Sequence, residues 1–211
     1  MNPNPSVRFF DQQFEQQLAA RQFELNPFEL AALPHVRGKV LDYGCGLGNL
    51  AVAAARKGCS VFALDGSHAA IEHLRSVAGR EALPIVAAEA DLRIHEVMED
   101  FDSVVCIGLL MFFDCRTAYR KLESLKACVR PGGVGVFNVL IEGTTYMSMF
   151  SPAEHCLFRP EDLAHSFSDW EVVRAWRQEF PAPGDTRKIF ATVIARKPWA
   201  GGDDTLNLPD S

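Results

Sequence analysis

A glycine-rich turn between a predicted strand and a predicted helix constrains this chain more than any other feature of its sequence. Residues 40–49 read Val-Leu-Asp-Tyr-Gly-Cys-Gly-Leu-Gly-Asn. Because glycine has no Cβ atom, such a turn lets the backbone approach a ligand closely where a helix begins. A strand, a glycine-rich turn and a helix in this order are typical of α/β proteins that bind nucleotides.

Short β-rich segments alternate with helical segments along the rest of the chain, which predicts a mostly parallel sheet. The turn Pro131-Gly132-Gly133 is predicted to precede the fifth strand. We expect strands at residues 39–43, 60–64, 84–88, 101–107 and 134–139, and helices at residues 49–57, 67–78, 116–129 and 160–167.

Two more β-rich segments, Trp170–Phe180 and Lys188–Arg196, follow this alternating pattern. The segment Pro181–Thr186 between them is too short for a crossover helix, so the two strands are predicted to be antiparallel neighbours. The predicted fold class is α/β. We expect a single doubly wound Rossmann-like domain with a seven-stranded, mostly parallel sheet, one antiparallel strand near its edge, and flanking helices.

Charge and composition exclude several kinds of partner. The chain has 21 basic and 27 acidic residues, a net charge of -6, and no long basic run, so nucleic acid is not an expected partner. The strongly apolar stretch at residues 106–113 is far shorter than the roughly 20 residues that span a bilayer. The start of the chain lacks a signal-peptide pattern. The six cysteines form no C-x-x-C pair, so we expect reduced cysteines, no metal site and a cytoplasmic protein.

Three acidic residues follow predicted strands and suggest the kind of ligand. Asp42 beside the turn would repel a pyrophosphate but suits an ammonium or a sulfonium group. A dinucleotide fingerprint would need glycine where Asn49 stands. Asp65 ends the second strand, where a carboxylate can accept both hydroxyls of a ribose. Asp91 follows the third strand and is placed to accept from an adenine amino group, with Leu92 near the ring.

In these motifs the chain resembles the class I S-adenosylmethionine-dependent methyltransferases, whose first motif, LDxGCGxG, corresponds to Leu41–Gly48. The resemblance covers residues 10–197 and implies S-adenosylmethionine as cofactor and S-adenosylhomocysteine as product. It also implies a small-molecule substrate; we expect no membrane partner and a monomer or homodimer. Further landmarks in family order are Asp65, Asp91, Phe101-Asp102 and Arg130-Pro131-Gly132-Gly133.

Within that family the chain is most similar to the TehB-like, tellurite-resistance branch. That branch carries a His-Arg pair in the final hairpin, of which Arg187 remains here. The segments that carry this likeness are Phe10–Phe14, Leu110–Phe112, Leu157–Leu163, Trp170-Glu171 and Phe190–Lys197.

The resemblance gives each part of the chain an expected role. Residues 1–38 are predicted to form an N-terminal helical lid, residues 39–197 the S-adenosylmethionine-binding methyltransferase domain, and residues 198–211 a flexible tail. The helix around Phe10 and Phe14 and the irregular insertion Ile141–Phe158 are expected to cover the methyl group.

The predicted site divides into cofactor-binding and catalytic residues. His155, in the insertion, is the candidate general base or substrate contact, and Arg187 is a candidate for holding an anionic substrate. The predicted cofactor-binding residues are Asp42, Gly44, Cys45, Gly46, Gly48, Asp65, Gly66, Ala90, Asp91, Leu92, Ile107 and Met111.

The expected reaction is in-line transfer of a methyl group to a small molecule, such as the chalcogen oxyanions tellurite and selenite. An organic hydroxyl, amine or thiol is the alternative acceptor. A nucleotide-dependent oxidoreductase and a protein that binds the cofactor without catalysis are the other two function classes left open.

Overall fold

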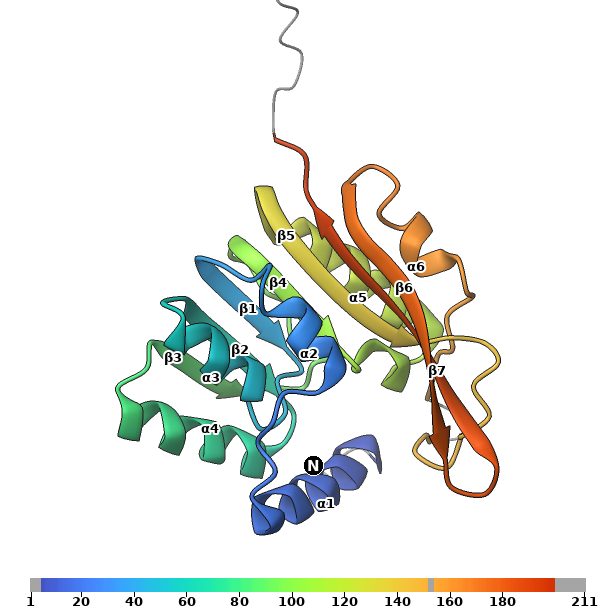
Figure 1. The fold of residues 1–211 in the computed structure, drawn as a ribbon, viewed down its shortest axis with the longest axis horizontal. Coiled ribbons are helices and arrows are strands. Elements are labelled where there is room, and N and C mark those ends of the chain that lie inside the picture. The colour runs from blue at the N-terminus through green and yellow to red at the C-terminus, as the bar shows by residue number, and fades with distance from the viewer. Residues whose placement is uncertain (1–4, 152–153, 200–211) are drawn as a thin grey trace, which may run out of the picture.

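A seven-stranded sheet crosses the molecule in the order β3-β2-β1-β4-β5-β7-β6 (Figure 1). The computed structural model describes residues 5–151 and 154–199. Neighbouring strands from β3 to β5 are parallel, whereas β7 runs antiparallel to both β5 and β6. The predicted fold class is therefore confirmed. The strands are β1 (Lys39–Tyr43), β2 (Ser60–Asp65), β3 (Ile85–Glu89), β4 (Phe101–Ile107), β5 (Val129–Leu140), β6 (Glu171–Ala182) and β7 (Thr186–Arg196).

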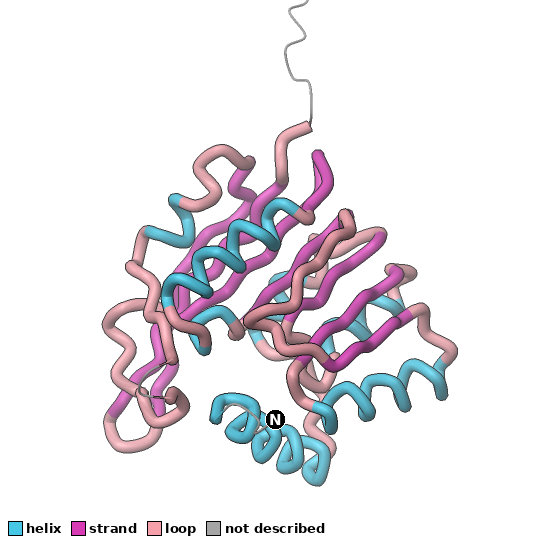
Figure 2. The backbone as a smooth tube through the Cα atoms, turned by 180° about the vertical axis from the view of Figure 1, so that it is seen from behind, coloured by secondary structure: helices cyan, strands magenta, loops and turns pink. Residues whose placement is uncertain are grey.

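Helices cover both faces of the sheet (Figures 1 and 2). One face packs against α2 (Pro27–Ala32), α3 (Asn49–Arg56) and α4 (His68–Glu81). The other face packs against α5 (Cys115–Ala127) and α6 (Asp162–His165). The remaining helices, α1 (Pro5–Ala20) and the short 3-10 helix η1 (Leu110–Phe112), lie beyond the carboxyl ends of the parallel strands.

Strand alternation decides which side chains can form a site. Along β1, Leu41 and Tyr43 join the core under α5, whereas Val40 joins the core under α3. Because successive side chains of a strand point to opposite faces, Asp42 shares the face of Val40. A carboxyl group is thus placed inside the sheet, close to the end of the strand, on the face that α2 and α3 cover.

The fifth strand differs from the prediction at its start. β5 begins at Val129, and Pro131-Gly132-Gly133 lies within it instead of forming a separate turn. The pairing of β4 with β5 shifts between Phe101 and Ser103 of β4. The segment Pro131-Gly132-Gly133 therefore forms an irregularity in β5. The predicted turn is wrong because a bulge absorbs the proline and the glycines while the strand continues.

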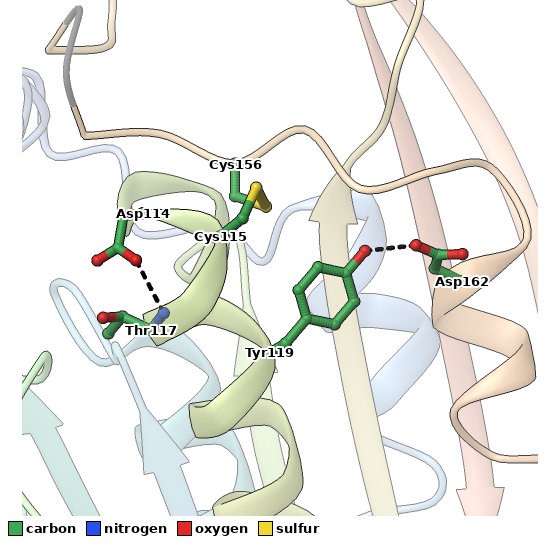
Figure 3. The surroundings of a disulfide bond; sticks show 6 residues. All are labelled: Asp114, Cys115, Thr117, Tyr119, Cys156 and Asp162. Atoms are coloured by element: carbon green, nitrogen blue, oxygen red, sulfur yellow. Dashed lines mark hydrogen bonds between the residues drawn. A yellow bond between two sulfur atoms is a disulfide. The ribbon is translucent and has the colours of Figure 1, made fainter.

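A disulfide bond between Cys115 and Cys156 ties the segment after β5 to the first turn of α5 (Figure 3). The Asp114 side chain caps the same helix by accepting from the Thr117 amide, at 3.0 Å. The expectation of reduced cysteines is wrong for this pair, because a separation of 41 residues leaves no spacing signal in the sequence. It is right for the four free, buried cysteines Cys45, Cys59, Cys106 and Cys128.

Within the described residues, no helix has both the length and the apolar character needed to cross a membrane. Residues 200–211, most of the predicted tail, lie outside the described part of the chain. The cytoplasmic location stays a prediction.

The disulfide predicts a dependence of stability on reductant. It closes a loop across 41 residues, and loop closure of this size stabilises a folded protein by roughly 2–4 kcal/mol. Chemical denaturation with and without dithiothreitol measures the free energy of unfolding. We expect reductant to lower that free energy in the wild-type protein and to leave the Cys115→Ser/Cys156→Ser double variant unchanged. Equal stability of the wild-type protein with and without reductant would contradict this.

Candidate functional site

A cavity of about 1370 Å³ opens at the carboxyl ends of the parallel strands. Its walls come from the loops after β1 to β4, from α1 and α2, and from the β6–β7 hairpin. Ligand pockets commonly measure about 300–1,000 Å³. The cavity is therefore large enough for a cofactor and a second small molecule together.

The glycine-rich turn forms one wall of the cavity. Gly44 and Gly46 have positive φ angles of 87° and 52°, a region that favours glycine. The amides of Gly44 and Cys45 donate to the carbonyl of Leu64 at the end of β2, at 2.8 and 3.0 Å. These two hydrogen bonds hold the turn against the neighbouring strand.

Asp65 fixes the turn from the end of β2. Its Oδ2 accepts from the Gly46 amide at 2.8 Å, and its Oδ1 accepts from the Ser67 amide at 2.9 Å. An ionised carboxylate offers about four acceptor sites, so each oxygen keeps capacity for a ligand hydroxyl. Burial raises the pKa of Asp65, and the amides of Ser67 and Gly46 oppose that shift.

Asp42 is the most unusual group in the cavity wall. Its side chain is buried, and its Oδ2 has no hydrogen-bond partner among the described residues. Burial, followed by the nearby charges of Glu29 and Asp65, raises the pKa of Asp42 to about 8. A buried carboxyl oxygen without a partner is costly, and a donor with positive charge would relieve that cost.

Asp91 lies at the rim of the same wall, in the loop after β3. Both of its oxygens pair with the Arg93 side chain, at 3.0 and 2.8 Å. The hydrogen bond from Arg93 lowers the pKa of Asp91. Leu92 beside it is buried and lines the cavity.

Helix α1 covers the cavity with aromatic side chains. The Phe10 ring packs edge-on against Phe112 of η1, with ring centroids 4.8 Å apart, and Phe112 contacts Phe150 of the insertion at 5.1 Å. The Phe14 ring lies so close to Gly46 that a Cβ atom there would be 3.1 Å from it. Asp11 accepts a hydrogen bond from the Ser67 hydroxyl, which holds α1 to the start of α4. The part of α1 around Phe10 and Phe14 therefore lies against the glycine-rich turn.

The far end of the cavity is built on β5 and β7. Asn138 is fully buried, and its Nδ2 donates to Oγ1 of Thr192 on β7 at 2.8 Å, while its Oδ1 has no partner among the described residues. Three aromatic rings follow towards the hairpin tip. Phe28 of α2 lies 4.9 Å from Phe190 and 5.8 Å from Phe180 between ring centroids. Both hairpin rings line the cavity.

The structure brings the predicted cofactor residues together with one exception. All of them except Gly48 line the cavity. Gly48 has a φ of 77° at the start of α3, and a Cβ atom there would lie 2.5 Å from the buried Leu74 side chain. Its place in the structure is a packing position behind the turn.

The two candidate catalytic residues lie outside the set of cavity-lining residues. The His155 ring stacks on Phe150 with centroids 5.1 Å apart, and its Nδ1 is buried without a partner in the described residues. The Arg187 side chain donates to the Gly143 carbonyl at 3.3 Å and lies 3.7 Å from Glu179. Their assignment to catalysis stays a prediction.

Several cavity residues were missed from the sequence. Asn138 had a signal, because it is the single strongly polar residue in the apolar run Val134–Leu140. Glu29, Phe28 and Lys188 gave no comparable signal, since only the folded chain brings α2 and the hairpin to the cavity.

Comparisons with known proteins agree with this geometry. Residues 29–180 match the family model described as tellurite resistance protein TehB. The chain is 25% identical over 166 residues to a probable S-adenosyl-L-methionine-dependent methyltransferase TehB of Haemophilus influenzae, covering 75% of this chain and 57% of that protein. The crystal structure of TehB from the same organism superposes with a TM-score of 0.71 and 22% identity, covering 82% of this chain and 62% of that chain.

Two further relatives are similar over most of this chain. Hemagglutinin 1 of Eikenella corrodens is 27% identical over 166 residues, covering 76% of this chain and 55% of that protein. The N-methyltransferase NodS of Bradyrhizobium japonicum, solved with S-adenosylhomocysteine, has a TM-score of 0.67 and 19% identity, covering 90% of this chain and 98% of NodS. The chain spans about half the length of the curated relatives it matches.

Gly48 and Gly79 lie in different surroundings, so replacing each with alanine should have opposite effects on the stability of the protein. Gly48→Ala should lower the free energy of unfolding by about 2–4 kcal/mol, because the new Cβ meets Leu74 and the backbone is left-handed. Gly79→Ala is the matched control: it lies within α4 with open space around it and should stabilise the protein by about 0.5–1 kcal/mol. Thermal denaturation measures both variants. Equal effects of the two substitutions would show that Gly48 is not a packing position.

Proposed function

The chain belongs to the tellurite resistance protein TehB family, and we propose that it transfers a methyl group from S-adenosylmethionine to a small acceptor molecule. The observation that carries the proposal is the buried Asp42 oxygen without a partner, set beside a glycine-rich turn in a cavity with room for two molecules. Nothing else described in the chain explains why a carboxyl group is buried there.

The residues of the cavity fit the proposed cofactor. Asp42 would accept from its ammonium group, and Asp65 would accept from the ribose hydroxyls with the lone pairs left free by Gly46 and Ser67. The apolar side chains of Leu92 and Ile107 would contact the adenine and the neighbouring atoms. A dinucleotide would instead bring a pyrophosphate against Asp42, which argues against the oxidoreductase alternative.

When bound, S-adenosylmethionine would supply a methyl group carried on a sulfonium sulfur. The acceptor's lone pair would bond to the methyl carbon while the carbon–sulfur electron pair returns to sulfur. The chain's own residues would orient the two reactants and exclude bulk water from the site of that step. Contacts between Phe10, Phe112 and Phe150 join α1, η1 and the insertion, and these rings would keep bulk water away from a bound methyl group. A displacement of this kind needs no catalytic dyad if the attacking atom does not have to lose a proton first.

The division into a lid at residues 1–38 and a methyltransferase domain at residues 39–197 is part of this proposal. Contacts of α1 with the turn and with α4 support the lid. A chalcogen oxyanion such as tellurite or selenite remains a proposed acceptor on the strength of the family. An organic hydroxyl, amine or thiol is the alternative, which the aromatic side chains at the hairpin end of the cavity favour.

The raised pKa of Asp42 predicts how cofactor affinity depends on pH. The ligand's ammonium group needs an ionised Asp42, and this carboxyl is mostly protonated below pH 8 in the empty protein. Calorimetric titration with S-adenosylhomocysteine should therefore show affinity rising by up to roughly tenfold per pH unit from pH 6 towards pH 8. NADH should not bind.

Two variants separate this explanation from others. Glu29→Gln removes a charge that raises the pKa of Asp42, so its affinity profile should move to lower pH. Asp42→Asn should bind weakly at every pH and, because no buried carboxylate has to form, should be more stable than the wild-type protein at pH 9. Tight binding of NADH, or affinity for S-adenosylhomocysteine that does not change with pH in the wild-type protein, would count against the proposal.

A further inference from the structure

The far half of the cavity carries groups that the proposed cofactor does not use. On β7, Lys188, Phe190 and Thr192 are alternate residues, so their side chains share one face of the hairpin. Asn138 pairs with Thr192 across the strands and shares that face. These four residues form a row along the hairpin, with Asn138 at its inner end and Lys188 at its outer end. The two ends are four strand residues apart, a span of about 13 Å.

The inner end of the row is a hydrogen-bond acceptor without a donor. Oδ1 of Asn138 is buried and unpartnered in the described part of the chain, while Nδ2 of the same amide donates to Thr192. A buried carbonyl oxygen attracts an N–H group and repels an oxyanion or a thiolate. The apolar residues Ile107, Leu140 and Phe190 also line the cavity near this end and offer no base to take a proton from a hydroxyl.

The outer end of the row is a cation. Lys188 lines the cavity, its Nζ lies 5.6 Å from the centre of the Tyr146 ring, and it forms no ion pair among the residues described. The backbone amides of Thr145 and Tyr146 donate to the Arg187 carbonyl, at 2.9 and 3.1 Å, which fixes this part of the insertion against β7. A partly buried ammonium group without a counter-ion is a site for an anion.

The middle of the row is aromatic. Phe180 and Phe190 meet edge to face with centroids 5.9 Å apart, and Phe28 of α2 contacts both. Such rings favour a flat apolar or aromatic body over a small hydrated ion.

Resting on the proposed function, we infer that the methyl acceptor is an amine carried on an aromatic or apolar body with an anionic group at its opposite end. Asn138 accepts from the amine N–H and aims the nitrogen lone pair, Phe190 and Phe180 hold the body, and Lys188 binds the anion. The acceptor reacts as the neutral amine, its ammonium form having first given one proton to solvent. Its lone pair forms the new N–C bond as the methyl–sulfur bond breaks, and the methylammonium product releases one proton to water. Asn138 is thus a positioning residue and Lys188 a specificity residue.

Two probes that differ only by a carboxylate test this assignment. Protein saturated with S-adenosylhomocysteine is titrated calorimetrically with 4-(2-aminoethyl)benzoate and with 2-phenylethylamine. We expect the wild-type protein to bind both, and the carboxylate probe roughly tenfold more tightly, because a charged hydrogen bond is added. Selenite and tellurite should not bind.

Variants assign the two ends separately. Lys188→Gln should weaken the carboxylate probe about tenfold and leave 2-phenylethylamine within twofold, whereas the matched control Arg177→Gln, an exposed charge on β6 outside the cavity lining, should change neither. Asn138→Leu should weaken both probes by about 10- to 100-fold. Affinity for S-adenosylhomocysteine should be unchanged in all three variants, which shows that they fold.

The outcomes separate this inference from the function on which it rests. Failure of either amine to bind the loaded protein, or tight binding of selenite or tellurite that Asn138→Leu abolishes, overturns the amine assignment and leaves the methyltransferase proposal standing. Failure of S-adenosylhomocysteine itself to bind overturns the proposed function. Equal loss of both probes in Lys188→Gln overturns the role given to Lys188.

Discussion

The hydrogen bonds of Asp65 fix the position of the glycine-rich turn that forms one wall of the cavity. Its two oxygens accept from the amides of Gly46 and Ser67, so one carboxylate joins the turn after β1 to the turn before α4. With the turn fixed in this way, the Asp42 side chain is buried beside it, on the wall of the cavity. The structure thus places two carboxyl groups within one wall. Burial, then the charge of Glu29 and then that of Asp65 raise the pKa of Asp42. An apolar ligand would leave the buried Asp42 carboxyl group without a partner, whereas a cationic ligand would stabilise its ionised form.

The two ends of the cavity differ in chemical character, and this difference follows from the order of the strands in the sheet. Its acidic end is built by the parallel strands β1, β2 and β3, and its aromatic end by β5 and the antiparallel β6–β7 hairpin. Because β7 runs opposite to β5, its first residues extend past the carboxyl edge of the parallel sheet and form a wall there. The disulfide of Cys156 holds the insertion to α5 and so helps to fix Met149 and Phe150 beside this wall. A cationic cofactor at the acidic end and an apolar acceptor at the aromatic end match this division.

The sequence predicted the acidic end far better than the aromatic end. The acids Asp42, Asp65 and Asp91 lie at or just after the carboxyl ends of strands whose order is read directly from local patterns. Parallel strands bring these ends, and the turn with them, to one edge of the sheet. The hairpin was also predicted, from the shortness of its connection. The aromatic end depends on contacts between segments far apart in the chain, such as Phe28 with Phe190, and on a disulfide across 41 residues. Local periodicity carries no information on such pairs. For the same reason, the residue types of His155 and Arg187 do not show where their side chains point.

We propose that Asp42 faces the positive group of the cofactor and that the aromatic end of the cavity stays free for the acceptor. A crystal structure of the complex with S-adenosylhomocysteine tests this most directly. We expect the ligand's amino group within hydrogen-bond distance of Asp42 Oδ2, its ribose on Asp65, and no ligand atom against Asn138 or Lys188. A ligand with its adenine against Asn138, or with Asp42 still unpartnered, would contradict it.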